Sequence, residues 1–462
     1  MQHDAFEQGS AMASEASLLS ILLAAGKGVR MRSALPKVLH PVGGRSMLAH
    51  TLATAQAAGA LRIGLVVAPD ADRVSAEARR LVPEVEIFEQ PIQAGTAHAV
   101  LAARAALESN RGDVLVMFAD TPLVEAATLR RLIEALDAGA HLAVLAFEPQ
   151  DPTGYGRLIT DGAGRVTAIR EHKDATEAER AIRLCAAGAM AFRLPSLGSF
   201  LGRIGNKNAG GEYYLTDAVA LAAGEDLVVR FVTCSVDEAL GVNSREQLAA
   251  AEAAFQRRAR RKAMQGATLI APETVWFSFD TVIGQDVTIE PNVFFGPGVM
   301  VEDGAHIMAN CHFVGATIRK GARVGPFARL RPGARIGVNA RIGNFVEVKN
   351  ATLETGAKAN HLAYIGDGRV GEGANIGAGT IFCNYDGYNK HFTDIGEGAF
   401  VGSNTSLVAP VKVGAGAYIG SGSIITKDVT PDSLALERTE QQERPGWAAK
   451  FRLLMKKRKK PS

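Results

Sequence analysis

A glycine-rich turn and two basic residues near the start of the chain have the chemistry to bind a nucleotide and its phosphates. Leu23–Met31 reads LAAGKGVRM, and Lys37 follows in LPK. Small residues let the backbone approach a base and phosphates closely, and Arg30 and Lys37 could neutralise phosphate charge. Met31 stands at the third glycine position of a dinucleotide-binding turn, and a Walker A loop would need GxxxxGK[ST]. We therefore predict a phosphate-binding turn of another kind.

Two further residues have types suited to catalysis. Asp120 follows the apolar run Val114–Phe118, and at the carboxyl edge of a parallel sheet it would lie where ligands bind. The alternative is a turn residue before Thr121-Pro122. His361 could accept a proton near neutral pH, because free imidazole has a pKa of about 6.5, although a lone histidine is often structural. Both residues are kept as candidates.

The composition excludes several classes of protein. The 462 residues carry a net charge of +3 and include 49 glycines and only 6% aromatic residues. A near-neutral balance is unlike that of a nucleic-acid-binding protein. Four cysteines without a CxxC pair argue against disulfides or a zinc cluster. No Lys or Arg precedes Lys27, and no apolar run reaches about 18 residues, so we expect a cytosolic protein without a signal peptide or membrane segment.

The first half of the chain has the pattern of an α/β domain. Residues 1–17 are small and polar and are expected to be a disordered leader. Over 18–243, buried strand-like runs such as 19–24, 63–67 and 114–118 alternate with helical stretches such as 47–58 and 126–138. This alternation predicts a Rossmann-like domain with a mostly parallel sheet.

A helix is predicted over 244–264, between the two halves. Ser244 and Gln247 have the spacing of a capping box. Arg257, Arg258 and 260–262 form a basic face, which we interpret as a solvated side of a linker helix, with a binding surface as the alternative.

The second half has a period of six residues. Apolar residues recur at 283, 289, 295, 301, 307 and 313, step by five to 318, and continue at 324, 330, 336, 342 and 348. The period returns at 370 and 376 and again from 395 to 425. Hexapeptide repeats predict a parallel β-helix over 265–436, with about 18 residues per coil. The polar, aromatic segment 383–394 breaks the pattern and is expected to be a projecting, functional loop, while 437–462 forms a basic tail.

These motifs together carry a family resemblance. LAAGKGVRM and the following PK resemble the signature of sugar-nucleotide pyrophosphorylases. With QAGTAHA, FADTPL, GEYYLTD, GPFARLRPGA, NHLAYIGD and CNYDGYNK, nearly all of residues 19–450 resembles the bacterial family that combines N-acetylglucosamine-1-phosphate uridylyltransferase with glucosamine-1-phosphate N-acetyltransferase. The resemblance implies a left-handed β-helix, a homotrimer with acyl-CoA sites between subunits, Mg²⁺ as cofactor, and a role in supplying precursor for peptidoglycan and lipopolysaccharide.

The resemblance also assigns residues to two sites. The implied UTP and UDP-N-acetylglucosamine site consists of Leu23, Ala24, Ala25, Gly26, Arg30, Lys37, Gln90, Gly95, Thr96, Phe118, Asp120, Gly156, Glu171, Ala186 and Asn243. Within it, the resemblance implies that Gln90, Gly95 and Thr96 bind the uracil base, that Gly156, Glu171 and Asn243 hold the sugar, and that Asp120 and Asn243 hold the metal. In the acetyltransferase site, our own interpretation of the residues makes His361 the candidate general base and Glu347 the candidate residue to orient it. For the same site, the resemblance implies that the glucosamine 1-phosphate residues are Arg331, Lys349, Tyr364, Asn375 and Lys390, and that the acetyl-CoA residues are Ala378, Asn384, Tyr385, Ser403, Ser421 and Arg438.

The chain departs from the family pattern at a few positions. Ala186 stands where the family usually has Asn, which removes an amide expected to bind the sugar. Phe118, Leu240 and Ser421 replace Tyr, Glu and Ala, which are tolerable changes. A nucleophilic Cys383 would need a nearby base and a lowered pKa, so we favour direct acetyl transfer.

Two other functions remain as alternatives. One is a pyrophosphorylase whose β-helix only oligomerises, and the other is a noncatalytic scaffold with the same two folds. The basic tail at 456–460 is interpreted as solvated, with CoA phosphate or nucleic acid as alternative ligands. The expected partners are otherwise small molecules (UTP, glucosamine 1-phosphate and acetyl-CoA), with no membrane and no nucleic acid.

Overall fold

The computed structural model describes residues 18–458, so the predicted leader at 1–17 and the last residues of the basic tail lie outside the described part. The chain divides into two compact units, one ending at Ala259 and the other beginning at Arg260. Across residues 18–458, no helix combines the length and apolarity that crossing a membrane requires.

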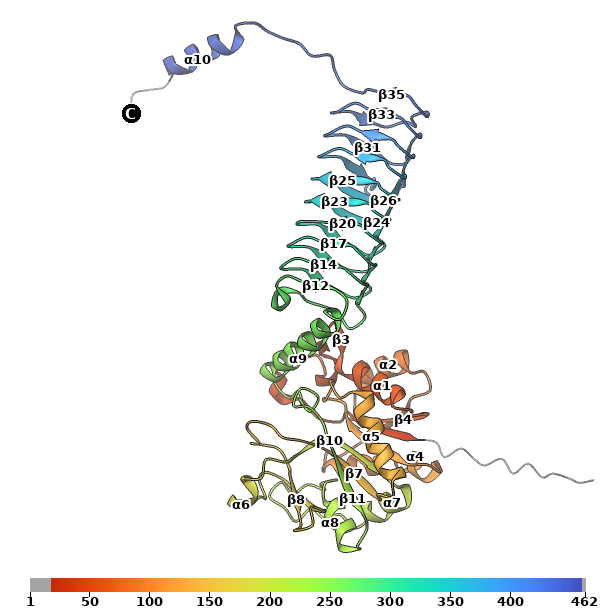
Figure 1. Cartoon of the computed structure of the whole chain (residues 1–462), viewed down its shortest axis with the longest axis vertical. Coiled ribbons are helices and arrows are strands. Elements are labelled where there is room, and N and C mark those ends of the chain that lie inside the picture. Colours follow the sequence, from red (N-terminus) through yellow and green to blue (C-terminus); the bar gives the residue numbers. More distant parts are fainter. Residues whose placement is uncertain (1–17, 459–462) are drawn as a thin grey trace, which may run out of the picture. The chain divides into compact units, whose positions relative to one another are not determined.

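A mostly parallel sheet forms the centre of the first unit. Its main strands run in the order β11-β7-β10-β6-β1-β4-β5. Figure 1 labels β11, β7, β10 and β4 among them. All neighbours pair in parallel except β10, which is antiparallel to β6 and β7. The strand bounds are β1 Leu19–Leu23, β4 Arg62–Val67, β5 Glu86–Glu89, β6 Val114–Phe118, β7 Leu142–Phe147, β8 Arg157–Thr160, β9 Val166–Arg170, β10 Cys185–Phe192 and β11 Val229–Thr233, with a small hairpin of β2 Pro41–Val42 and β3 Arg45–Ser46. The predicted fold class is confirmed.

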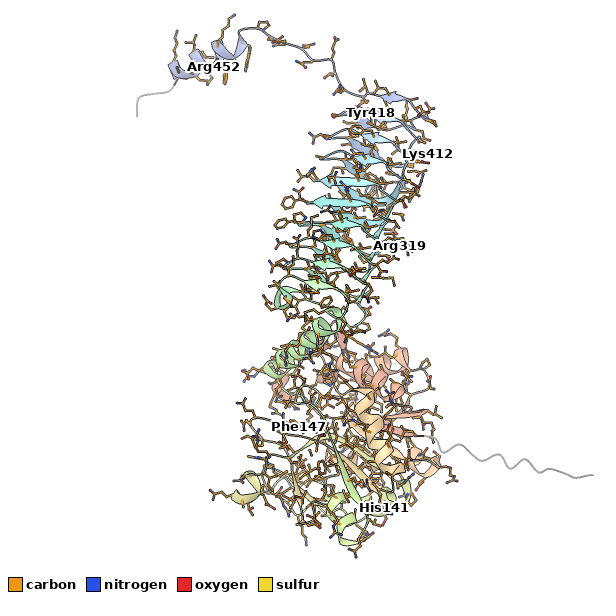
Figure 2. All side chains as sticks on the ribbon, in the orientation of Figure 1. His141, Phe147, Arg319, Lys412, Tyr418 and Arg452 are labelled. Atoms are coloured by element: carbon orange, nitrogen blue, oxygen red, sulfur yellow. The ribbon has the colours of Figure 1, made fainter. Side chains whose placement is uncertain are left out.

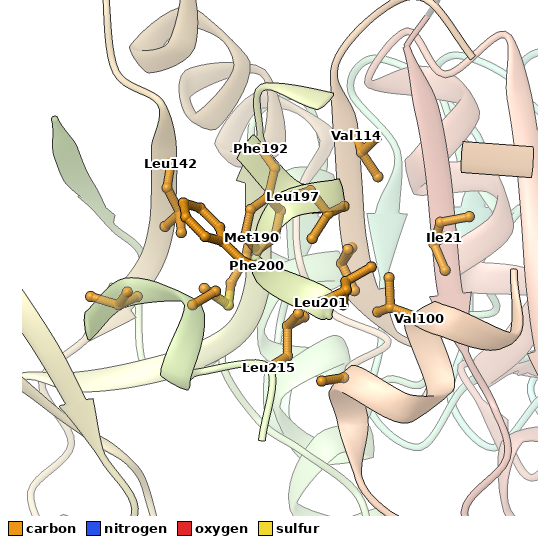
Figure 3. Packing of buried hydrophobic residues seen from close by; sticks show 14 of the residues in the cluster. Ile21, Val100, Val114, Leu142, Met190, Phe192, Leu197, Phe200, Leu201 and Leu215 are labelled. Carbon is orange, nitrogen blue, oxygen red and sulfur yellow. The ribbon is translucent and has the colours of Figure 1, made fainter. Parts of the chain in front are cut away.

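Helices cover both faces of this sheet. They are α1 Met47–Ala57, α2 Asp72–Leu81, α3 Thr96–Ala102, α4 Arg104–Ser109, α5 Ala126–Asp137, α6 Glu177–Arg180, α7 Leu194–Leu201 and α8 Asp217–Gly224. Alternate strand residues enter two separate apolar cores, because successive side chains of a strand point to opposite faces. Val114 and Val116 of β6 lie in one core, and Leu115 and Met117 lie in the other. Figure 3 shows part of the first core, where Phe192 lies near residues of α7.

The helix α9, Arg245–Ala263, spans the boundary between the two units. Its start differs from a full capping box. The Ser244 hydroxyl accepts from the Gln247 N–H at 3.2 Å, but the side-chain Oε1 of Gln247 accepts from the N–H of Asn243 at 2.7 Å, one residue earlier than predicted. This bond ties Asn243, a predicted site residue, to the helix.

The basic face of α9 is solvated in part: Arg261 and Lys262 are exposed, as expected, whereas three other arginines also bind neighbouring groups. Arg257 Nη2 lies 2.6 Å from Asp237 Oδ1, and Arg258 Nε lies 3.1 Å from Glu125 Oε1. Arg260 donates to the Val275 carbonyl at 2.9 Å and lies over the Trp276 ring. These three side chains hold the helix to its neighbours rather than facing water alone.

The second unit is the predicted parallel β-helix, and its strands form three ladders (Figure 1). The first ladder contains β12 Thr268–Leu269, β14 Thr288–Ile289, β17 His306–Ile307, β20 Arg323–Val324, β23 Arg341–Asn344, β25 Lys358–His361, β27 Asn375–Ile376, β30 Phe400–Val401, β33 Tyr418–Ile419 and β35 Leu434–Ala435. The second contains β15 Phe294–Phe295, β18 His312–Phe313, β21 Arg329–Leu330, the start of β24 Glu347–Leu353, the start of β26 Tyr364–Val370, β28 Ile381–Cys383, β31 Ser406–Val408 and β34 Ile424–Ile425. The third contains β13 Val282–Ile283, β16 Met300–Val301, β19 Thr317–Ile318, β22 Arg335–Ile336, the ends of β24 and β26, β29 Thr393–Ile395 and β32 Val411–Val413. A last helix, α10, spans Trp447–Arg458.

The six-residue period corresponds to the inward positions of the β-helix. Every apolar residue of the predicted series except Ile283 is 5% exposed or less. Most form the second residue of a short strand whose first residue is more exposed, while Val370, Ile395 and Val413 end longer strands. Outward residues such as Arg319, Lys412 and Tyr418 lie at the surface (Figure 2). Most coils repeat after 17 or 18 residues, as in Thr288 with His306 and His306 with Arg323. The predicted loop lengthens one repeat, so Asn375 pairs with Phe400.

We expect the inward positions to determine the stability of the β-helix. Ile336 is fully buried in β22, whereas its neighbour Arg335 is exposed. Ile336→Ala should lower the free energy of unfolding by about 2–5 kcal/mol, because it removes buried methylenes and leaves a cavity. Arg335→Ala should change it by less than about 0.5 kcal/mol. Denaturant unfolding of the two variants, followed by circular dichroism, measures the difference, and equal losses would contradict the assignment.

Candidate active sites

A cavity of about 770 Å³ opens in the first unit beside the ends of β1, β6 and β10. The structure gathers around it every residue that the sequence assigned to the nucleotide, the sugar and the metal. These are Leu23, Ala24, Ala25, Gly26, Arg30, Lys37, Gln90, Gly95, Thr96, Phe118, Asp120, Gly156, Glu171, Ala186 and Asn243. Such a cavity at the carboxyl ends of parallel strands is where open α/β sheets bind ligands.

The glycine-rich turn after β1 is shaped by close contact with Lys37. Gly28 has φ of +60°, a conformation that favours glycine. A Cβ at Gly28 would lie 2.7 Å from the Cβ of Lys37, so a side chain there would displace the lysine. On the other side of the turn, Gln93 Nε2 donates to the Ala25 carbonyl at 2.5 Å. The turn is therefore held between Lys37 and Gln93.

Lys37 joins the two predicted metal ligands. Its Nζ lies 2.5 Å from Asp120 Oδ2 and 3.0 Å from Asn243 Oδ1, and only 9% of the Lys37 side chain is exposed. Asp120 follows β6, and Asn243 precedes α9, so three distant segments meet at one cation. One carboxylate and one amide oxygen are hard donors of the kind that Mg²⁺ accepts, together with water and substrate phosphates. The donor set fits such an ion. Among residues 18–458, no cluster of three or more His, Cys, Asp or Glu could hold a metal by itself.

The predicted base-reading residues are fixed by contacts within the protein. Gln90 is 3% exposed, and its Nε2 lies 3.1 Å from both the Gly95 carbonyl and His98 Nδ1. Both amide hydrogens are thus engaged, which sets the direction of the Gln90 carbonyl. Gly95 has φ of +118°, and a Cβ there would lie 2.5 Å from the Tyr213 carbonyl oxygen. The Thr96 hydroxyl accepts from the Leu215 N–H at 2.9 Å.

The opposite wall of the cavity contains the predicted sugar residues. Glu171 Oε1 accepts from the Thr216 hydroxyl at 3.0 Å. Burial raises the pKa of Glu171, although the bond from Thr216 acts in the opposite direction. Ala186 donates its N–H to the Gly156 carbonyl at 2.9 Å and has no polar side chain to offer. The predicted sugar residues on this wall thus include the carboxyl group of Glu171 and leave the Ala186 position apolar.

In the β-helix, the exposed His361 ends β25, and its Nδ1 lies 2.6 Å from Asn344 Oδ1. The two residues are in register on adjacent strands. The prediction that Glu347 orients His361 is wrong. Glu347 starts the next face and accepts from Arg331 at 2.8 Å and from Arg329 at 3.2 Å. The orienting partner of His361 is an amide rather than a carboxylate.

Basic side chains gather around Asp367 at another corner of the coil. Lys349 Nζ and Lys390 Nζ lie 4.0 and 3.9 Å from Asp367 Oδ2. Lys390 and, to a lesser degree, burial lower the pKa of Lys349, while Asp367 acts to raise it. Burial would raise the pKa of Asp367, but bonds from Asn350 and Asn384 and the nearby lysines outweigh it and lower that pKa. Two ammonium groups held this closely favour a dianionic ligand between them.

The remaining predicted residues of the glucosamine 1-phosphate site lie on two different faces of the β-helix. Tyr364 is in register with Glu347 on the second ladder, beside the basic corner. Asn375 lies on the first ladder, in register with Lys358 of β25, the strand that carries His361. The described chain therefore brings Arg331, Lys349 and Lys390 together, and it places His361 and Asn375 on a different face.

Three of the predicted acetyl-CoA residues form a column with His361. The register-paired inward residues are Ile342, Ala359, Ile376, Val401 and Ile419, and two residues after each come Asn344, His361, Ala378, Ser403 and Ser421. Neighbouring strands lie about 4.8 Å apart, so Ser421 lies roughly 14 Å along the column from His361. Arg438 donates to the Ser421 carbonyl at 2.8 Å and joins this column.

The projecting loop lies apart from that column. Asn384 is buried and donates from Nδ2 to Asp367, at the basic corner, and Tyr385 is 60% exposed. In the described chain the Cys383 thiol has a backbone carbonyl, that of Ile381, as its hydrogen-bond acceptor, and no histidine or carboxylate bonds to it. This environment does not favour a nucleophilic Cys383.

Sequence reasoning missed four residues that complete these sites: Gln93, Thr216, Asn344 and Asp367. Three of them stand inside motifs that carried the resemblance, namely QAGTAHA, GEYYLTD and NHLAYIGD. Their presence in those motifs was the available signal. Asn344 likewise stands in IGNFVEVK, another segment that resembles the family, and its pairing with His361, 17 residues later, follows from the coil register.

Two family models agree with the two folds. Residues 20–189 match the model of the MobA-like NTP transferase domain, and residues 392–427 match the bacterial transferase hexapeptide model with six repeats. Among solved structures, UDP-glucose pyrophosphorylase complexed with UDP-glucose is similar at a TM-score of 0.44 and 15% identity, over 52% of this chain and 99% of its own.

Curated relatives match the chain over almost its whole length. "Bifunctional protein GlmU" of Bradyrhizobium sp. (strain ORS 278) is 57% identical over 94% of this chain and 97% of its own. The proteins of the same name from Azorhizobium caulinodans and Maricaulis maris are each 58% identical, over 95% of this chain and 98% and 97% of theirs. Identity at this level over both units means that the chain belongs to the family of bifunctional GlmU proteins.

Proposed function

We propose that this bifunctional transferase makes UDP-N-acetylglucosamine in two steps. The β-helix, residues 265–436, transfers an acetyl group from acetyl-CoA to glucosamine 1-phosphate. The α/β domain, residues 18–243, then joins the product to UTP and releases pyrophosphate. The observation that carries the proposal is the convergence of fifteen predicted residues on one cavity, together with intact His361 and its basic corner in the same chain.

In the acetyl transfer, the free amine of glucosamine 1-phosphate attacks the thioester carbonyl of acetyl-CoA. A C–N bond forms, and His361 Nε2 accepts a proton from the nitrogen as general base. The tetrahedral intermediate then breaks its C–S bond, and the proton passes from His361 to the departing sulfur to give free CoA. Arg331, Lys349 and Lys390 carry the charges needed to bind the sugar phosphate.

In the uridylyl transfer, a phosphate oxygen of N-acetylglucosamine 1-phosphate attacks the α-phosphorus of UTP. The bond from that phosphorus to the β-phosphate oxygen breaks, and pyrophosphate leaves. Such reactions depend mainly on in-line positioning and neutralised charge. Lys37 and Arg30 bind phosphates, Gln90 and Gly95 orient the base, and Glu171 holds the sugar. Asp120 and Asn243 would hold Mg²⁺, which supplies charge neutralisation for the phosphates when bound.

We also propose a homotrimer in the cytoplasm, where UTP and acetyl-CoA are available. His361 and the basic corner stand on different faces of one coil. A neighbouring copy could bring one face next to the other, which supports sites shared between subunits.

The product is a precursor for peptidoglycan and lipopolysaccharide. No observation favours the alternatives of an oligomerising β-helix without activity or a scaffold, since neither needs these side chains.

The direct test of the proposal is one incubation with glucosamine 1-phosphate, acetyl-CoA, UTP and Mg²⁺, analysed by mass spectrometry. We expect UDP-N-acetylglucosamine. N-Acetylglucosamine 1-phosphate alone would refute the uridylyl half, and the absence of both products would refute the proposal.

The two activities should be separable by single substitutions. Asp120→Ala should lower uridylyl transfer at least about 100-fold, because it removes charged oxygens from the phosphate site, and should leave acetyl transfer unchanged. His361→Ala should have the converse effect, since a general base contributes about 10²–10⁴-fold. Separate assays of the two half-reactions measure this. Loss of both activities in either folded variant would contradict the model of two independent sites.

Restoring the family amide at position 186 should strengthen sugar binding. We expect Ala186→Asn to lower the KM for N-acetylglucosamine 1-phosphate about 2- to 10-fold, since one hydrogen bond contributes about 0.5–1.5 kcal/mol. The KM for UTP should stay the same. Ala186→Val is the matched control, because it adds bulk without an amide. A lower KM for N-acetylglucosamine 1-phosphate in both variants would argue against a specific hydrogen bond.

Sharing of the acetyltransferase site can be tested by complementation. His361→Ala and Lys349→Ala chains should each lack acetyl transfer, whereas co-expressed mixed oligomers should recover part of it. Two different affinity tags isolate the mixed species, and uridylyl transfer serves as the internal reference. If purified mixed oligomers stay inactive, each chain contains its own complete site.

A further inference from the structure

We propose that Asn344 is the positioning residue for His361: its side-chain oxygen accepts from His361 Nδ1–H and thereby keeps Nε2 unprotonated and directed at the substrate amine. This inference rests on the proposed acetyl transfer and adds to it a group that acts through His361. The two atoms lie 2.6 Å apart. An amide oxygen can only accept a hydrogen bond, so the hydrogen between them must come from Nδ1.

The coil register holds the pair in place. Asn344 and His361 occupy the same position on β23 and β25, and the Leu362 N–H donates to the Asn344 carbonyl at 2.9 Å. A backbone bond and a side-chain bond therefore link the same two segments. Because the strands also pair through Ile342 and Ala359, neither side chain can shift along the column without disturbing the ladder.

The corner next to this pair has an unusual backbone. Phe345 and Leu362, which directly follow Asn344 and His361, have φ of +56° and +48°, and Phe327 one coil earlier has +57°. Other coils place Asn or Gly at this corner, as at Asn310, Gly379 and Asn404. Bulky residues rarely adopt this conformation, and strained backbone tends to cluster at functional sites. The strain is confined to the coils that carry and precede the His361–Asn344 pair.

The choice of an amide matters because of the charges nearby. The three strands around His361 are β23, β25 and β27, and none of them contains a carboxylate. Their charged residues are Arg341 and Lys358, and Glu347 on the next face is bonded to Arg329 and Arg331. A carboxylate partner would stabilise the imidazolium and favour protonation of the base. A neutral amide orients the ring without that effect.

Two substitutions separate orientation from charge. Asn344→Ala removes the acceptor, so we expect kcat for acetyl transfer to fall about 10- to 100-fold at every pH, a part of the general-base contribution. The KM values for glucosamine 1-phosphate and acetyl-CoA should stay within about threefold. Asn344→Asp keeps an acceptor of the same shape but adds a charge. For this variant, the pH at which acetyl transfer falls off on the acidic side should rise by about one unit or more. At pH values well above that point, its kcat should be within a few fold of that of the unmodified chain.

The controls use the complete chain. Arg323→Gln, on the neighbouring strand β20, changes an exposed residue and should leave the pH profile unchanged. Uridylyl transfer and the melting temperature report on folding, and if Asn344→Ala unfolds the β-helix, the isosteric Asn344→Asp decides alone. An unshifted profile for Asn344→Asp, or a raised KM with normal kcat for Asn344→Ala, would overturn the inference. If the unmodified chain itself fails to acetylate glucosamine 1-phosphate, the proposed function fails first.

Discussion

The hydrogen-bonded register between successive coils is the constraint on which the second half of the molecule depends. Each strand is only two to seven residues long, and its backbone groups pair with the coils above and below it. Because most repeats are 17 or 18 residues long, a residue's place in the sequence determines its column and face. His361, Ala378, Ser403 and Ser421 form a line for this reason alone. A long, thin acyl donor fits such a line better than it fits a rounded pocket.

In the first unit, the sheet rather than a repeat brings the site residues together. These residues stand at the ends of separate strands and in loops. Lys37, Asp120 and Asn243 are up to 206 positions apart in the sequence, yet one ammonium group contacts both oxygens. The bond from the Asn243 N–H to Gln247 links this site to the start of α9.

The sequence predicted much of this structure because periodicity reports directly on burial. The six-residue spacing located the inward residues of the β-helix, and the alternation of strands and helices located the parallel sheet. The glycine-rich turn and Asp120 were placed correctly at the cavity because strand ends share one edge. The prediction that was wrong concerned which polar side chain orients His361. Glu347 is closer to His361 in sequence than Asn344, but it begins another face, and only the coil register reveals that.

The basic residues of α9 illustrate the same limit. Composition alone could not distinguish a solvated face from one that bonds to Asp237, Glu125 and the Val275 carbonyl. Pairing of this kind depends on which surfaces the fold brings near the helix. Contacts between charged side chains that are far apart in the sequence cannot be predicted from the residues of one segment alone.

The lengthened repeat between Asn375 and Phe400 shows where this architecture tolerates change. The additional residues leave the coil at a corner, and the ladder resumes with Val401 and Ile419 in place. Closing a longer loop costs little additional entropy, and each coil contacts only its neighbours. Insertions at corners can therefore alter what is bound without altering what holds the solenoid together. Ligand preference and mechanical integrity can evolve separately in such a fold, one through its corners and the other through its faces.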